Sequence, residues 1–165
     1  MKRIFPSCQF VFVLLFLVSA SFAQDFDSSK YKPRTLEELI NLNQATPKVP
    51  AEKKVAYISA DWFYSQIRVK YVGTSRPISP AGREILKNWQ TAFKVPVETV
   101  NLFEKEYLFI ECDREFWMPV QQSVSTYFPK ELKAGDMITI FTILAGGLRT
   151  SGKLELLFLV NEFEK

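Results

Sequence analysis

The sequence contains no histidine. This absence excludes Ser-His-Asp and Cys-His catalysis, and it removes the side chain that most often binds transition metals. Cysteine is almost as scarce, since the 165-residue chain has two. Cys8 lies in an N-terminal segment that we expect to be cleaved, so Cys112 is left without a partner for an internal disulfide. The exported protein would therefore depend on its apolar core rather than on cross-links.

Long apolar runs are also missing. The N-terminal run from Phe10 to Val18 is shorter than the roughly 20 residues of a membrane-spanning helix. Lys2 and Arg3 precede it, and small residues follow it as far as Ala23. This order predicts a signal peptide over residues 1–23. A buried hydrophobic segment is the alternative. We expect a periplasmic or secreted protein with no stable membrane span after cleavage.

Neither charge sign dominates. The chain has 21 basic and 18 acidic residues, and removal of Lys2 and Arg3 leaves 19 against 18. Nucleic-acid binding depends on clustered positive charge, so a nucleic-acid partner is not expected. The remaining chain also lacks the Asn-x-Ser/Thr glycosylation pattern, which is consistent with a bacterial envelope protein.

Residues 24–54 are predicted to form an N-terminal arm. Thr35-Leu-Glu-Glu38 matches a capping box, and a short apolar stripe follows, which favours one helix of two to three turns. Pro47 and Pro50 then mark a linker. The helix could dock on the main domain or serve as an arm for a partner. Residues 55–165 are assigned to a single β-barrel domain.

Two sequence patterns predict a strand and a helix in the first half of that domain. Gln66 to Tyr71 alternates polar and apolar residues, which predicts a half-buried strand with Ile67, Val69 and Tyr71 facing the core. Ser79-Pro80 is a typical helix start, with serine as the cap and proline in the first turn. The apolar spacing after it predicts a helix that ends near Lys94.

A hairpin is predicted at the centre of the domain. Tyr107 to Cys112 and Glu115 to Val120 are rich in aromatic and apolar residues and are separated by Asp113-Arg114. This turn would place Ile110 opposite Trp117 and leave Cys112 buried within a strand. Pro119 cannot donate a ladder hydrogen bond, so its strand should lie at a sheet edge or end at a bulge.

The C-terminal part is predicted to contain one short helix to about Phe128, a turn from Pro129 to Gly135, and two apolar strands. The strands are Met137 to Ala145 and Leu154 to Phe163, with Gly146-Gly147 in the loop between them. The second strand is apolar on both faces, whereas a sheet with one wet face would alternate. Its alternation places Leu154, Leu156, Phe158 and Val160 on one face and Leu157, Leu159 and Phe163 on the other. Both faces must then be covered, as in a small closed barrel with helices outside.

The fold class that follows is α+β: a small, mostly antiparallel β-barrel of about five strands with two or three covering helices. A helix between the third and fourth strands, and Gly135-Asp136 before an apolar strand, resemble the OB-fold. The resemblance covers roughly Ser65 to Phe163 and is one of topology alone. An SH3-like barrel or another α+β sheet is the alternative.

No residue pattern predicts a catalytic centre, a metal site or a cofactor. Glu111, Asp113 and Glu115 cluster near the predicted hairpin turn, but their spacing does not match a calcium loop, so we interpret them as solvated. A pair of acids drawn from Asp61, Glu98 and Asp136 could serve a glycosidase only if the fold brought two of them within about 5–10 Å.

Aromatic side chains beside basic ones suggest a binding surface. On OB-type barrels such residues hold extended strands of sugar or nucleic acid. The candidate ligand-binding residues are Arg68, Lys70, Tyr71, Trp117 and Trp62. The alternative is that the aromatic rings fill the core and the two basic side chains form a solvated face.

The sequence thus predicts an exported, non-enzymatic module that binds a protein or an extended polysaccharide or peptide. One alternative is a carboxylate-dependent hydrolase that acts on a polysaccharide. Another is a structural subunit of an envelope assembly, which would carry an exposed apolar patch.

Overall fold

The computed structural model of the protein describes residues 26–44, 54–150 and 153–165. The fold is α+β, with a seven-stranded, mostly antiparallel sheet. The strands are β1 (Lys32–Pro33), β2 (Val55–Tyr57), β3 (Ser65–Pro77), β4 (Phe103–Glu111), β5 (Arg114–Gln121), β6 (Met137–Thr150) and β7 (Lys153–Glu164). The helices are η1 (Ser28–Lys30), α1 (Leu36–Gln44), α2 (Pro80–Phe93), α3 (Val97–Val100), α4 (Gln122–Ser125) and α5 (Phe128–Glu131).

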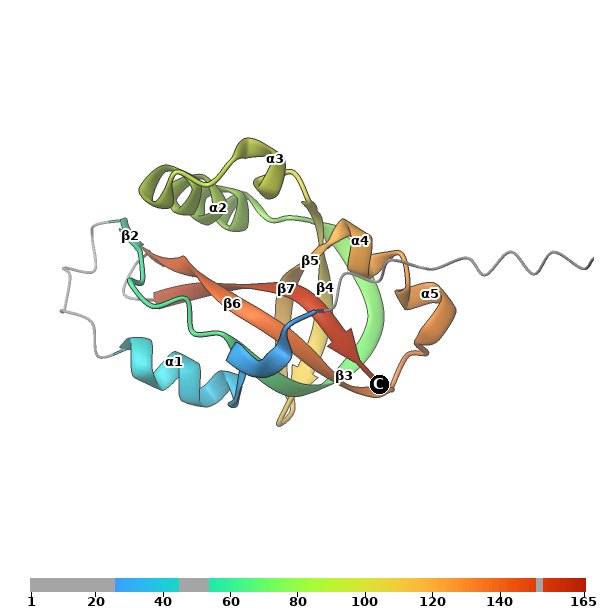
Figure 1. Cartoon of the computed structure of the whole chain (residues 1–165). Coiled ribbons are helices and arrows are strands. Elements are labelled where there is room, and N and C mark those ends of the chain that lie inside the picture. Colours follow the sequence, from blue (N-terminus) through green and yellow to red (C-terminus); the bar gives the residue numbers. More distant parts are fainter. Residues whose placement is uncertain (1–25, 45–53, 151–152) are drawn as a thin grey trace, which may run out of the picture.

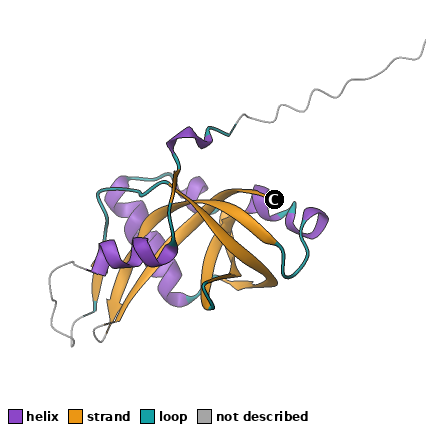
Figure 2. Cartoon of the chain, turned by 90° about the horizontal axis from the view of Figure 1, so that it is seen from below, coloured by secondary structure: helices purple, strands orange, loops and turns teal. Residues whose placement is uncertain are grey.

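Five of the strands pair in a closed ring. The order is β3-β4-β5-β7-β6, and an antiparallel pairing between β3 and β6 closes it. All ring pairings are antiparallel except that of β5 with β7. The expected small barrel of about five strands is therefore confirmed as a ring. In chain order, α4 and α5 lie between its third and fourth strands, β5 and β6. The strands bend strongly instead of forming a flat layer (Figure 2).

Two apolar clusters hold the ring and its helices together. One, which we call the inner cluster, contains Ile67, Val69 and Tyr71 of β3, which confirms the predicted inward face of that strand. The other joins the ring to α2, which lies with α3 along one side of the strands (Figure 1). Leu159 and Val160 of β7 belong to different clusters, so this strand is covered on both faces, as its composition predicted.

A bulge in β7 explains one difference from the expected alternation. Phe163 was expected on the same face as Leu157 and Leu159, yet it packs with the cluster inside the ring. Phe141 pairs with Glu162, while the next residue, Thr142, pairs with Val160. The extra residue, Asn161, shifts the alternation by one position, so side chains beyond it change face.

The N-terminal helix docks on the ring. Leu36 and Leu39 of α1 are fully buried in the inner cluster. The backbone N–H of Leu36 donates to both carboxylate oxygens of Glu111, at 3.1 and 2.9 Å, so the end of β4 caps α1. Glu38 N–H donates to Thr35 Oγ1 at 3.1 Å, which is one half of the predicted capping box.

Helix α2 begins and ends as the sequence predicted. Ser79 Oγ accepts a hydrogen bond from Gly82 N–H at 3.1 Å, and Pro80 occupies the first turn. Lys94 adopts a left-handed conformation at the C-terminus and its N–H bonds to Gln90 O. Ile85, Leu86 and Trp89 form the buried face.

The predicted hairpin exists, but its turn and register are wrong. Glu111 pairs with Arg114, so the turn residues are Cys112 and Asp113, both with positive φ. Ile110 consequently lies opposite Glu115 rather than Trp117. Cys112 is exposed in the turn and not buried in a strand. Two left-handed turn residues match the right-handed twist of a hairpin, and this requirement outweighed the apolar character of the thiol.

Two predicted loops are also wrong. Gly146 and Gly147 lie within β6, which continues to Thr150. A Cβ at Gly146 would lie 2.5 Å from the carbonyl oxygen of Tyr57, so the glycine lets the end of β2 approach β6 closely and does not end the strand. Pro129 lies in the first turn of α5 rather than in a separate turn, because proline is tolerated at the start of a helix.

The predicted signal peptide, residues 1–23, lies outside the described residues, as does most of the predicted linker. Among the helices that the structure describes, none is long and apolar enough to cross a membrane.

Candidate functional site

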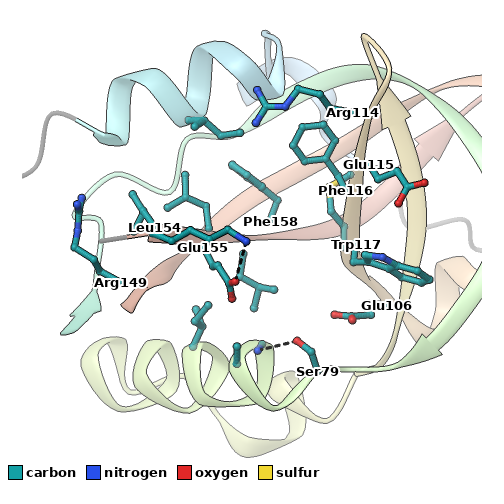
Figure 3. Close-up of a pocket in the computed structure, with 18 of the residues that line it drawn as sticks. Ser79, Glu106, Arg114, Glu115, Phe116, Trp117, Arg149, Leu154, Glu155 and Phe158 are labelled. Atoms are coloured by element: carbon teal, nitrogen blue, oxygen red, sulfur yellow. Dashed lines mark hydrogen bonds and ion pairs between the residues drawn. The ribbon is translucent and has the colours of Figure 1, made fainter. Parts of the chain in front are cut away.

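A cleft of about 850 Å³ lies between β5 and β7. Arg114 to Met118 of β5 form one wall, and Lys153 to Phe158 of β7 form the other. Helix α1 lies along one side of the cleft and α2 along the opposite side (Figure 3). We call this hollow the β5–β7 cleft.

The cleft exists because its two walls meet at one end and separate toward the other. Val120 and Val160 form the bridge between β5 and β7, and within the described residues it is their one pairing. Toward Arg114 and Lys153 each strand stays paired with its other neighbour, β4 or β6. Partial opening of this kind is a known property of small, strongly twisted barrels.

The side of the cleft beneath α1 is mostly apolar. Ile40 of α1, Phe116 of β5, and Leu156 and Phe158 of β7 line it. Phe116 and Leu156 are only half-buried, although both pack against the inner cluster. Burial of these side chains by a ligand would be favourable, at about 25 cal/mol for each Å² of apolar surface removed from water.

The side of the cleft beside α2 carries an ion pair and a tryptophan ring that contact each other. The Nε of Arg76 donates to Glu106 Oε1 at 2.5 Å, and the Glu106 side chain is almost completely buried. The Arg76 guanidinium also stacks on the Trp117 ring, with Cζ 3.9 Å from the ring centre. Ion pair and stacking together hold the indole at the cleft wall.

Positive charge at the open end of the cleft comes from β5 and from β6, the neighbour of β7. Arg114 lies at the start of β5, where its guanidinium is 5.5 Å from the Phe116 ring centre, and Arg149 lies near the end of β6. Neither arginine forms an ion pair with any residue in the part of the chain that is described. Glu155 is paired with Lys153 at 3.5 Å. Two cationic groups are thus available to a ligand.

The structure does not bring the five predicted contact residues together. Trp117 alone lines the β5–β7 cleft. Arg68 and Lys70 are exposed on β3, away from it, and Tyr71 is buried against Phe109 and Phe128. Burial, together with neighbouring Tyr107, raises the pKa of Tyr71, which fits an interior ring rather than a surface contact.

Trp62 belongs to a second hollow of about 470 Å³ between α2 and the N-terminal segment, which we call the aromatic pocket. The Trp62 ring lies 5.9 Å from Trp89 and 5.7 Å from Phe93, measured between ring centres. These edge-on contacts fasten the segment before β3 to α2. The contacts explain Trp62 as a packing residue.

The predicted acids take several different roles. Glu111 caps α1 instead of being solvated at a turn. Asp61 accepts a hydrogen bond from Phe63 N–H, and Asp136 is paired with Lys165, and neither lines the β5–β7 cleft. A different set does line it: Glu106, Glu115 and Glu155. Within the described residues there is no group of three His, Cys, Asp or Glu side chains that could hold a metal ion.

Sequence reasoning missed most of the cleft residues. Arg76, Glu106, Arg114 and Arg149 come from four different strands, and their proximity depends on the ring. One signal did point to the site: Pro119 predicted a strand that lies at a sheet edge or ends at a bulge. β5 lies between β4 and β7, but within the described residues Val120 is its one bridge to β7, so most of that edge is unpaired.

Comparison with protein-family models, curated proteins and solved structures finds no match to the chain.

Proposed function

We propose that the protein is an exported, non-enzymatic binding module that holds an extended ligand in the β5–β7 cleft. The observation that carries this proposal is the cleft itself. It is a preformed hollow of about 850 Å³, within the size range of ligand sites. An aromatic ring, a set of half-buried apolar side chains and two arginines that form no ion pair within the described residues line it.

Export is supported by the N-terminal pattern of basic residues, an apolar run and small residues. Its test is N-terminal sequencing of the protein recovered outside the cytoplasm, with Gln24 as the expected first residue. A product that begins at Met1 would contradict it.

Binding is tested by adding ligands to the ¹⁵N-labelled protein and mapping the amide shifts. The ligands are random peptide mixtures and soluble oligomers of glucose and of N-acetylglucosamine. Shifts should gather on β5, β7 and α2, and Trp117→Ala should abolish them. Tyr127→Ala, an exposed aromatic residue outside the cleft, is the matched control and should leave binding intact.

A polysaccharide hydrolase is the second candidate, because Glu106, Glu115 and Glu155 line the same cleft. Two of them already have cationic partners: Arg76 binds Glu106, and Lys153 binds Glu155. Each of these two carboxylates is already held by a cation, whereas a glycosidase needs two acids that face the scissile bond. Release of reducing ends that disappears in Glu115→Gln would establish the hydrolase and overturn the binding-module proposal.

A further inference from the structure

The two walls of the β5–β7 cleft are strand edges. β5 is paired with β4 from Arg114 to Gln121, and β7 is paired with β6 from Lys153 to Glu164. Their facing edges meet at Val120 and Val160, and no strand of the described chain covers the remainder. An uncovered edge presents backbone N–H and C=O groups at every second residue, ready to pair with another strand.

We propose that the cleft binds an extended peptide, which adds a strand between β5 and β7. The proposal rests on the binding function proposed above, because it names the ligand class of the same cleft. A peptide in this position can pair its backbone with a free strand edge, whereas the hydroxyl groups of a sugar chain do not repeat at the spacing of the edge N–H and C=O groups. Strand addition of this kind is an established mode of peptide recognition.

The length of the free edges fixes the length of the guest. β5 is free from Arg114 to Pro119 and β7 from Lys153 to Leu159. At about 3.3 Å for each residue, this edge accommodates a guest of at most roughly six residues, because the space next to the Val120–Val160 bridge is too narrow for a third strand.

The two sides of the cleft specify which side chains the guest carries. Successive side chains of a strand point to opposite faces. One set would meet the apolar side beneath α1, with Ile40, Phe116 and Leu156. The other set would meet the polar side beside α2, with Ser79 and the Arg76–Glu106 pair. The ligand is therefore a peptide in which apolar and polar residues alternate.

The direction of the guest follows from the strands and the charges. β5 and β7 run parallel to each other, so a guest antiparallel to one is antiparallel to both. Antiparallel pairs are slightly more stable than parallel pairs. The guest would then end at the open end of the cleft, beside Arg114 and Arg149. We infer that an acidic residue or a terminal carboxylate follows the alternating segment.

The test selects peptides from a random displayed library on the immobilised protein. Selected sequences should alternate apolar and polar residues and end in an acidic group. The double variant Arg114→Glu/Arg149→Glu should weaken binding of the best peptide by roughly tenfold. Arg68→Glu/Lys70→Glu is the matched control: it makes the same charge change on exposed β3 positions outside the cleft and should change affinity less than about twofold.

Backbone pairing is tested separately with the best peptide. Methylation of its alternate backbone nitrogens keeps the side chains and removes hydrogen-bond donors, and it should reduce affinity by at least roughly tenfold. Amide protons of β5 and β7 that face the cleft should exchange more slowly when the unmethylated peptide is bound.

Three results would overturn the proposal, and they differ in what they say about function. If the methylated peptide binds as well as its parent, strand pairing is wrong but the binding module stands. If the library yields no peptide and sugar oligomers shift the cleft amides, peptide recognition is wrong and the binding module again stands. If neither class of ligand binds, both proposals fall.

Discussion

Val120 of β5 pairs with Val160 of β7, and in the described part of the chain this is the one bridge between the two strands. Both side chains are fully buried in the cluster inside the ring. The bridge closes the ring at one end and leaves the cleft open at the other, so core packing and the site share these two residues.

Truncation of a side chain at this bridge should therefore affect both stability and binding. Val160→Ala removes two buried methyl carbons and should lower the free energy of unfolding by roughly 2 kcal/mol. Ligand affinity should fall as well, because the cleft walls lose their fixed end. Urea unfolding followed by circular dichroism checks the first effect. Val97→Ala, at a half-exposed position of α3, should shift stability by less than about 0.5 kcal/mol.

The cap that Glu111 provides predicts a local effect on α1. Glu111→Ala leaves the first-turn N–H groups of the helix without their carboxylate and should cost about 1–2 kcal/mol. Hydrogen exchange should become faster across α1 before it changes in β4. Asn41→Ala, on the exposed face of the same helix, serves as the control. Equal exchange rates in both variants would show that the cap does not anchor the helix.

The Arg76–Glu106 ion pair predicts non-additive energetics. Arg76→Met leaves a buried carboxylate without its cation and should destabilise by about 1–3 kcal/mol. The double variant Arg76→Met/Glu106→Met should be more stable than the sum of the two single changes indicates, because it leaves no charge unpaired. Strictly additive unfolding energies for the three variants would rule out the coupling.

The turn at Cys112-Asp113 predicts a stabilising substitution. Both residues have positive φ, a conformation that Asn and Gly adopt at lower cost. Cys112→Asn/Asp113→Gly should raise the free energy of unfolding by about 0.5–1 kcal/mol. Glu115→Gly, in the extended β5 strand, should instead lower it. In the unaltered protein the exposed Cys112 thiol should react with a thiol reagent without prior unfolding.

Asp136 predicts a pH dependence. Hydrogen bonds from the Lys165 side chain and from Lys133 N–H lower the pKa of Asp136 below its ordinary value of 3.8. A lowered pKa stabilises the fold above that value, and the contribution disappears as the pH falls below it. Asp136→Asn should therefore be less stable than the unaltered protein at neutral pH, and the difference should shrink below about pH 4. Lys165→Gln should reduce the same difference; a pH-independent difference would contradict the assignment.

The sequence was most informative where structure is decided by neighbours in the chain. The serine cap and first-turn proline of α2, and the alternation from Gln66 to Tyr71, both depend on local periodicity and were predicted correctly. Pro119 pointed to incomplete pairing of β5, because its missing N–H is a property of the residue itself. These signals were sufficient to predict an α+β fold built on a ring of about five strands.

The candidate site was decided by tertiary structure. Its walls are the edges of β5 and β7 that face each other, and whether an edge is paired depends on strands distant in sequence. The same dependence explains the errors. Only the pairing of β2 with β6 shows why Gly146 lies within a strand, and only the docking of α1 turns Glu111 from a solvated acid into a cap. Sequence periodicity specifies which face of a strand is apolar, but pairing over long chain separations specifies which edges stay open, and in this protein the open edges form the site.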